Sequence, residues 1–192
     1  MQRPALACLT CLLMAACALA QAAPSGRADE LETFLAERGL LGQIEQVRQT
    51  VSNKASELVV NAMGFMGVPY KRGGNSAESG FDCSGFVRAM YQQTVGLVLP
   101  RKAEQQAAAT EKIEKRDLVP GDLVFFNTMR RTFSHVGIYI GDGKFIHSPK
   151  PGAEVRVENM GESYWSRRFD GARRVSPEAG SAAQQATGVQ RP

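Results

Sequence analysis

The sequence has few of the residues that most often carry chemistry. Its 192 residues include two histidines, one tryptophan and four cysteines. Cys8, Cys11 and Cys17 lie near the N-terminus, so Cys83 is the only thiol in the rest of the chain. A disulfide framework is therefore excluded beyond the N-terminal segment, and no closely spaced ligand pair there indicates a structural zinc site.

Clustered positive charge is also missing. The chain has 23 Lys and Arg against 19 Asp and Glu, a net charge of +4, and a pI of about 9.0. The basic residues form no long run and no patch interleaved with aromatic residues, which a nucleic-acid surface would need. We expect no nucleic-acid partner, because this mild excess suits an anionic wall polymer or a membrane surface better.

The apolar run near the N-terminus is too short to cross a membrane. Residues 5–20 follow Arg3 and fall below the roughly 18 apolar residues that a membrane span needs. A short positive region, an apolar core and small residues at its end are typical of a secretory signal peptide. We therefore expect residues 1–23 to direct export to the periplasm, with cleavage after Ala20 or Ala22.

A second processing route involves Cys17. Met14-Ala15-Ala16-Cys17 fits a degenerate lipobox, with methionine where leucine is usual, and acylation of Cys17 would anchor the protein to the outer membrane. By either route Cys83 is the only cysteine left within the folded domain. Because structural cysteines pair in an oxidising compartment, an unpaired exported thiol favours a role in chemistry.

The rest of the chain divides into three parts. Residues 24–51 carry short helical patterns interrupted at Gly39 and Gly42, and they predict a helical lead-in too short to bury its own core. Residues 52–175 predict one α+β domain. Residues 176–192 contain few large apolar residues and predict a disordered tail.

Within the domain, helical patterns precede strand patterns. Apolar residues repeat at helical spacing from Ala55 to Met66 and again after Cys83, and residues 102–112 are typical of an exposed helix. The expected strands are residues 123–126, 135–140, 144–147 and 155–157. Helices followed by strands predict an α+β fold with a small antiparallel sheet.

Cys83 lies where a helix is expected to begin. Gly80 interrupts the preceding segment, and Asp82 is a good N-cap for the helix that follows. The unpaired backbone N–H groups and the positive end of the helix dipole favour a thiolate, which is the nucleophilic form. The alternative is a buried structural cysteine, but Asp82, Ser84 and Gly85 are poor neighbours for a core residue.

Both histidines of the chain fall in one predicted hairpin around Gly141-Asp142-Gly143. A three-residue loop, with its last glycine in the left-handed conformation, would pair Ile140 with Lys144. In that register His135 and His147 lie on the same face as diagonal neighbours. A two-residue loop would place them on opposite faces, and we predict the three-residue loop.

Together these residues form a candidate catalytic triad. Cys83 would attack a carbonyl carbon, while His135 takes the thiol proton and returns it to the leaving amine. His147 would bond the far nitrogen of His135 and orient it, as an Asp or Asn does in other triads. The backbone N–H of Cys83 and the hydroxyl of Tyr70 are expected to stabilise the oxyanion. This chemistry needs no metal and no cofactor.

Five motifs occur along the domain in a fixed order. They are Tyr70-Lys71-Arg72-Gly73-Gly74, Asp82-Cys83-Ser84-Gly85-Phe86, Leu99-Pro100-Arg101, Pro120-Gly121-Asp122-Leu123-Val124-Phe125-Phe126 and His135-Val136-Gly137-Ile138-Tyr139. In this order they resemble the NlpC-type cell-wall cysteine peptidases, over about residues 52–172. The resemblance implies a compact papain-like fold with the nucleophile at a helix N-terminus.

The resemblance also implies roles for individual residues. It assigns catalysis to Cys83, His135 and His147, and the implied substrate-binding residues are Tyr70, Asp82, Ser84 and Arg101. Family members hydrolyse amide bonds in peptidoglycan, which is the expected partner of this protein. The chain is most similar to short exported Gram-negative members that cut the cross-link between meso-diaminopimelate and D-alanine. We expect a monomer.

Four other functions remain open at this point. The same site could hydrolyse the γ-D-glutamyl–diaminopimelate bond of a stem peptide, or transfer an acyl group to an amine or lipid acceptor. The domain could also be a wall-binding module without activity. Finally, Cys83, His135 and His147 could bind zinc together with a water molecule.

Overall fold

The computed structural model describes residues 33–34 and 38–176. The expected signal peptide with Cys17, and the expected tail beyond Ser176, lie outside the described residues. The chain divides into two compact units, Met1–Arg48 and Gln49–Pro192. All candidate catalytic and binding residues of the domain belong to the second unit.

Helix α2 (Leu40–Met63) is longer than the helical patterns indicated. It continues through Gly42 without a break, and the junction expected after residue 51 lies inside it. Gly39, with a φ of 66°, lies just before its first residue. The helix ends three residues before the expected end at Met66. Between residues 38 and 176, no helix is both long and apolar enough to cross a bilayer.

Three further α-helices and one 3-10 helix lie among the described residues of the second unit. They are α3 (Cys83–Val95), α4 (Ala103–Ala108), η1 (Lys115–Asp117) and α5 (Ser163–Ser166). Helix α3 begins at the predicted position and ends at Gly96, which has a φ of 74° and a left-handed conformation. The helix expected over residues 102–112 is wrong in its second half, because the chain there enters a strand.

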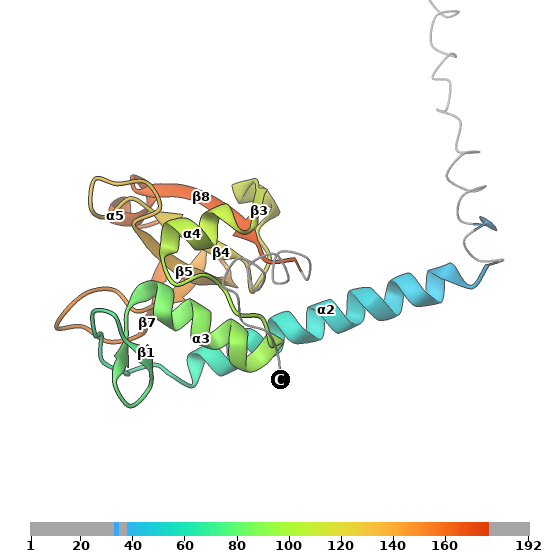
Figure 1. The fold of residues 1–192 in the computed structure, drawn as a ribbon. Coiled ribbons are helices and arrows are strands. Elements are labelled where there is room, and N and C mark those ends of the chain that lie inside the picture. The colour runs from blue at the N-terminus through green and yellow to red at the C-terminus, as the bar shows by residue number, and fades with distance from the viewer. Residues whose placement is uncertain (1–32, 35–37, 177–192) are drawn as a thin grey trace, which may run out of the picture. The chain divides into compact units, whose positions relative to one another are not determined.

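A six-stranded antiparallel sheet forms the centre of the second unit (Figure 1). Its order is β3–β8–β4–β5–β6–β7, with β3 Glu111–Ile113, β8 Phe169–Arg174, β4 Leu123–Phe126, β5 His135–Gly141, β6 Lys144–His147 and β7 Arg156–Asn159. Strands β1 (Asn75–Ser76) and β2 (Gly80–Phe81) form a separate small hairpin beside α3. The α+β prediction is confirmed, although strands β1, β2, β3 and β8 were not predicted.

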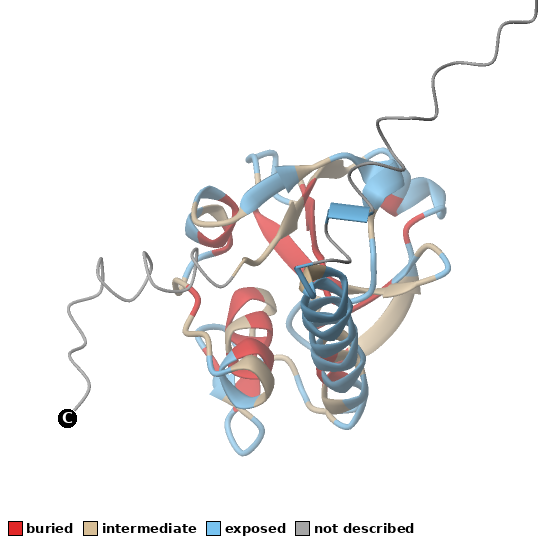
Figure 2. Ribbon diagram, turned by 90° about the vertical axis from the view of Figure 1, so that its right-hand side faces the viewer, coloured by how far each residue is buried: buried red, intermediate tan, exposed pale blue. Residues whose placement is uncertain are grey.

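The sheet is covered on both faces. Leu123 and Phe125 of β4 belong to a core with α3, whereas Val124 and Phe126 belong to a second core with Trp165 of α5. All four residues of β4 are buried, as the continuous apolar run indicated. Figure 2 shows the buried residues on α3 and on the strands of this sheet. Strand β5 pairs with β4 on one side and β6 on the other, and its first four residues are buried too.

The β5–β6 hairpin corrects the predicted loop and keeps the predicted register. Gly141 pairs with Lys144, so the loop has only two residues, and Asp142 and Gly143 have φ values of 50° and 68°. A bulge between Tyr139 and Gly141 adds one residue to β5, which restores the offset expected from a three-residue loop. Both histidines therefore lie on one face of the hairpin.

Candidate active site

Cys83 is the first residue of α3, and the preceding residue fixes this turn. Asp82 has extended backbone angles and caps the helix, because its Oδ1 accepts a hydrogen bond from the Gly85 amide at 2.7 Å. Its Oδ2 accepts from the Gly73 amide at 2.9 Å. A Cβ atom at Gly85 would lie 2.1 Å from the carbonyl oxygen of Gly74, so only glycine allows the loop to approach the helix this closely.

Arg101 forms an ion pair with the same carboxylate. Its Nη2 lies 2.6 Å from Asp82 Oδ2 and its Nη1 lies 2.9 Å from Oδ1, a two-point contact. The same Nη1 lies 3.1 Å from Ser84 Oγ. The structure therefore brings together three of the expected substrate-binding residues, as a polar network around the start of α3.

The two histidines form a direct hydrogen bond. His135 is the first residue of β5 and His147 the last residue of β6, and Nε2 of His135 lies 2.6 Å from Nδ1 of His147. The residues are 3% and 0% exposed. Between them, Gly137 leaves the necessary space, since a Cβ atom there would lie 3.1 Å from His147 Cβ and 2.7 Å from a ring carbon of Phe145. The prediction that the rings share a face is confirmed.

Trp165 covers the histidine pair. Its ring stacks on His135 with a centroid distance of 5.7 Å and an interplanar angle of 27°, and it meets His147 edge-on at 5.1 Å. Trp165 itself is 5% exposed, and Phe126 and Phe145 pack against it. This aromatic layer separates the histidine–histidine bond from water, which strengthens the bond.

Glu158 on β7 lies beyond the histidines and was not among the predicted site residues. Its Oε2 is 3.3 Å from Nε2 of His147, and Arg156 Nη2 is 2.5 Å from its Oε1. The alternation in Val155-Arg156-Val157 predicted a strand here, but that strand was expected to end one residue before Glu158. Two residues after Arg156, which pairs with His147, Glu158 lies on the same face of the sheet.

Electrostatics in the site favour neutral reacting groups. Burial and the nearby Asp82 raise the pKa of Cys83 to about 11, although backbone N–H groups of Val136, Ser84 and Cys83 itself oppose this. The prediction of a thiolate ionised by the helix end is therefore corrected: the helix amides act in the expected direction, but desolvation outweighs them. Burial and the neighbouring His147 lower the pKa of His135 well below its usual value.

The pKa values of His147 and Glu158, which lie behind His135, are also shifted. Burial lowers the pKa of His147, and the contact with Glu158 counteracts this. Burial would raise the pKa of Glu158, but His147 and Arg156 together lower it to about 2. Glu158 is thus ionised at neutral pH, while both imidazoles are neutral.

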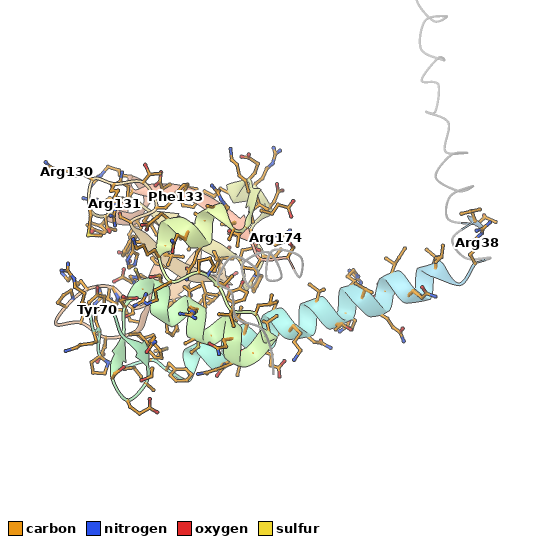
Figure 3. All side chains as sticks on the ribbon, viewed as in Figure 1. Arg38, Tyr70, Arg130, Arg131, Phe133 and Arg174 are labelled. Atoms are coloured by element: carbon orange, nitrogen blue, oxygen red, sulfur yellow. The ribbon has the colours of Figure 1, made fainter. Side chains whose placement is uncertain are left out.

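A pocket of about 490 Å³ opens onto Cys83 and His135. Tyr70 lines it, as expected, and the proximity of Cys83 contributes to a raised pKa of the Tyr70 hydroxyl, mainly caused by burial. Figure 3 shows Tyr70 on the same side of the second unit as Arg130 and Arg131. Asp82, Ser84 and Arg101 do not line this pocket, and a role in binding substrate stays a prediction for them.

The pocket wall is rich in charge. Its charged lining residues other than the candidate catalytic ones are Arg72, Lys150, Arg156, Glu158 and Glu162. Among the described residues, no group of three His, Cys, Asp or Glu side chains is placed to hold a metal ion. The pocket thus presents both cationic and anionic side chains beside the Cys83 thiol and the His135 ring.

An α+β domain with a cysteine at a helix N-terminus and a histidine pair on an antiparallel sheet defines a candidate thiol hydrolase. The sequence profile of the NlpC/P60 family matches residues 67–174, which is more than half of the chain, and the protein belongs to this family. The family resemblance inferred from the five motifs is confirmed.

Several characterised relatives are similar to this chain. Murein DD-endopeptidase MepH of Escherichia coli K12 is 41% identical over 138 residues, 70% of this chain and 51% of that protein. Gamma-DL-glutamyl hydrolase of Bacillus subtilis is 43% identical over 118 residues, 61% of this chain and 28% of that protein. Each match thus spans about half or less of the relative's own length.

Solved structures confirm the fold. An NlpC/P60 family protein from Bacillus cereus superposes with a TM-score of 0.59 at 36% identity, covering 64% of this chain and 40% of that chain. The NlpC/p60 domain of the peptidoglycan hydrolase SagA gives a TM-score of 0.56 at 34% identity, covering 63% of this chain and 98% of that domain.

Proposed function

We propose that the protein is an exported cysteine peptidase that hydrolyses the meso-diaminopimelate–D-alanine cross-link of peptidoglycan. The observation that carries this proposal is the 2.6 Å bond from His135 to His147, on a ring that lines the same pocket as Cys83. A cysteine, a base and a residue that orients the base are the parts that acyl transfer requires. The similarity to a murein DD-endopeptidase supports this choice of bond.

The reaction begins from a neutral thiol and a neutral imidazole. Nε2 of His135 is bonded to His147, so Nδ1 is the nitrogen that remains to take the proton from Cys83. The sulfur attacks the D-alanine carbonyl carbon, and the Cys83 N–H and Tyr70 hydroxyl stabilise the oxyanion. His135 then gives the proton to the departing amine. Water, activated by the same nitrogen, releases the acyl group and regenerates the thiol.

The charges of the pocket suit this substrate. Diaminopimelate carries a carboxylate on the carbon next to the amine that is released. Arg72 and Lys150 line the pocket and are exposed, so they are placed to attract such a carboxylate. We therefore assign peptidoglycan peptides as the partner of this pocket.

Digestion of a defined cross-linked muropeptide dimer tests the proposal. The parent protein should convert the dimer to two monomers, with the mass of one water gained, as measured by liquid chromatography and mass spectrometry. Cys83→Ser and His135→Gln should each lower the rate by about 10³-fold or more, because the nucleophile and its base act as a unit. Equal rates for parent and Cys83→Ser would overturn the proposal, and product joined to an added amine would indicate an acyltransferase.

A second candidate reaction is hydrolysis of the γ-D-glutamyl–diaminopimelate bond. The 43% identity to Gamma-DL-glutamyl hydrolase and the 39% identity to the Bacillus subtilis bifunctional muramidase/DL-endopeptidase CwlT favour it. The same cysteine and histidine would serve, because only the position of the peptide in the pocket differs. An uncross-linked stem peptide is the discriminating substrate: its cleavage, with an intact dimer, would support this candidate over the first.

A further inference from the structure

The polar contacts of the site extend past the two histidines to a carboxylate. Nε2 of His147 and Oε2 of Glu158 are 3.3 Å apart, which is an ion-pair contact. Both atoms are buried and neither makes a hydrogen bond to any group, so each is the polar partner left for the other. The other oxygen of Glu158 is held by Arg156, whose Nε and Nη2 both lie 2.5 Å from it. The side chain of Glu158 is 16% exposed. The site thus contains a four-residue row: His135, His147, Glu158 and Arg156.

The carboxylate of Glu158 determines which ring nitrogens of His147 and His135 carry protons. An ionised carboxylate has only acceptors, so Nε2 of His147 must carry a proton to satisfy Glu158. A neutral imidazole has a single N–H, which leaves Nδ1 of His147 as an acceptor. The 2.6 Å contact then requires a proton on Nε2 of His135. Nδ1 of His135 is left with a free lone pair, as a base needs.

Without the carboxylate, the two imidazoles could form the same contact in the opposite direction. Nδ1–H of His147 would then donate to Nε2 of His135, and the single proton of His135 would lie on Nδ1. In that tautomer His135 cannot accept the thiol proton of Cys83. Two neutral histidines alone do not choose between these states, because either ring can donate.

We propose that Glu158 is a positioning residue that fixes the tautomers of His147 and His135, so that the nitrogen available to Cys83 is unprotonated. It also supplies the negative charge that a pair of neutral histidines lacks, and so stabilises the imidazolium that forms when the thiol is deprotonated. Glu158 acts through His147. The assignment of tautomers stands by itself, whereas its catalytic consequence rests on the proposed function.

The charged groups around the histidines and Cys83 come from strand β7 and from the start of α3. His147 on β6 faces Glu158 and Arg156 of β7, and His135 also feels the charge of Glu158. Cys83 feels Asp82 at the start of α3. Of these, Glu158 is the carboxylate in contact with an imidazole, so its removal tests the idea most directly.

Nitrogen NMR of the histidine rings tests the tautomers without any substrate. The chain has only two histidines, so ¹⁵N-histidine labelling of the tag-free protein gives two ring systems. At neutral pH, both rings of the parent should show a protonated Nε2 and an unprotonated Nδ1. In Glu158→Gln, whose amide can donate as well as accept, Nδ1 of both rings should gain proton occupancy. A parent with Nδ1–H on either ring, or a Glu158→Gln spectrum identical to the parent, would overturn the proposal.

Kinetics test the consequence of this arrangement. Glu158→Gln should lower kcat for the muropeptide dimer by roughly 10–100-fold, as is typical when an outer partner of a histidine is lost, with KM nearly unchanged. The acid limb of its pH profile should move to lower pH, because the imidazolium loses a stabilising charge. Glu158→Asp should restore part of the rate. Glu154→Gln removes an equal charge from an exposed side chain of the same segment and should behave as the parent.

The rate at which Cys83 is alkylated tests the role of Glu158 without any peptidoglycan substrate. Iodoacetamide modification of the Cys83 peptide, followed by mass spectrometry, should be slower at pH 7 in Glu158→Gln than in the parent and in Glu154→Gln. If the parent does not cleave the dimer but alkylation slows as expected, the proposed function fails and the role of Glu158 stands. Equal alkylation rates in all three proteins would remove the role of Glu158.

Discussion

Cys83 is subject to opposing electrostatic influences. Backbone N–H groups at the start of α3 lower the pKa of its thiol, while burial and the carboxylate of Asp82 raise it to about 11. The same carboxylate caps the helix and forms an ion pair with Arg101, so its charge serves this turn while it disfavours the thiolate. The helix end alone does not ionise the thiol, which is why the proposed mechanism assigns its deprotonation to His135.

The substitution Asp82→Asn should shift the reactivity of Cys83 to lower pH. Asparagine is also a good N-cap, so the helix start is kept, while the negative charge that raises the thiol pKa is lost. The midpoint of Cys83 alkylation against pH, followed by mass spectrometry, should fall. Because the ion pair with Arg101 is broken, the melting temperature should fall too.

Asp117→Asn is the matched control, since Asp117 is an exposed carboxylate on η1. Its alkylation midpoint should equal that of the parent. A midpoint for Asp82→Asn at or above the parent value would contradict the role assigned to Asp82.

At the residue level, the sequence predicted those site residues that stand out because their residue type is rare in this chain. An unpaired cysteine and the only two histidines of the chain are visible without coordinates. Glu158 was missed because one carboxylate among 19 acidic residues has no local signal, and its partner is set by the pairing of β6 with β7. The predicted charge state of Cys83 was wrong, because the pKa of its thiol depends on burial by segments that are distant in the sequence.

At the scale of secondary structure, the β5–β6 hairpin decides whether the histidines meet. The predicted loop had three residues, whereas the structure combines a two-residue loop with a bulge after Tyr139. A three-residue loop, and a two-residue loop with a bulge, both shift the strand pairing by one residue. The predicted loop was therefore wrong, but the prediction that both histidines lie on one face was right. Strand β8 was missed for another reason: its sequence does not alternate, and its partners β3 and β4 are distant in the chain.

Gly137→Ala should separate the two strands at the histidines. The new Cβ atom would lie 2.7 Å from a ring carbon of Phe145 and 2.9 Å from the Ile146 carbonyl oxygen, closer than packed atoms allow. Crowding of this kind costs about 1–3 kcal/mol of folding free energy. Urea denaturation should show this loss, and hydrolysis of the dimer should slow because the rings move apart.

Gly42→Ala serves as the control for this substitution. Nothing lies within 4 Å of a Cβ atom at Gly42, and alanine is favoured over glycine inside a helix. Its stability should be unchanged or higher. A Gly137→Ala protein as stable and active as Gly42→Ala would show that the close approach at the histidines is not required.

At the scale of the whole molecule, the candidate catalytic residues all belong to the unit Gln49–Pro192. Helix α3, the β5–β6 hairpin, β7 and α5 each contribute one or two side chains to one pocket or to the row behind it. The sequence predicted part of this assembly, because motifs mark the start of α3, strand β5 and the neighbouring strand β4, whereas β7 and α5 carry no motif. How the protein is positioned in the cell was predicted from a different part of the chain, residues 1–23.

We propose that export and anchoring place this unit next to the cell wall, and Cys17 distinguishes the two routes. If Cys17 is acylated, the parent expressed in a Gram-negative host should incorporate radiolabelled palmitate and fractionate with the outer membrane. Cys17→Ala should then lose the label and appear in the soluble periplasmic fraction. Cys11→Ala is the control and should behave as the parent. A soluble, unlabelled parent would leave the cleaved signal peptide as the route.

The position of Trp165 has a practical consequence for measuring the protonation of His135. It is the only tryptophan in the sequence, and its indole stacks on the imidazole of His135. A positively charged ring in contact with an indole perturbs its electrons, so the emission of this one fluorophore should change whenever His135 gains or loses its proton. Under the proposed mechanism, the fluorescence of Trp165 would therefore report the protonation of His135 during the reaction without any added label.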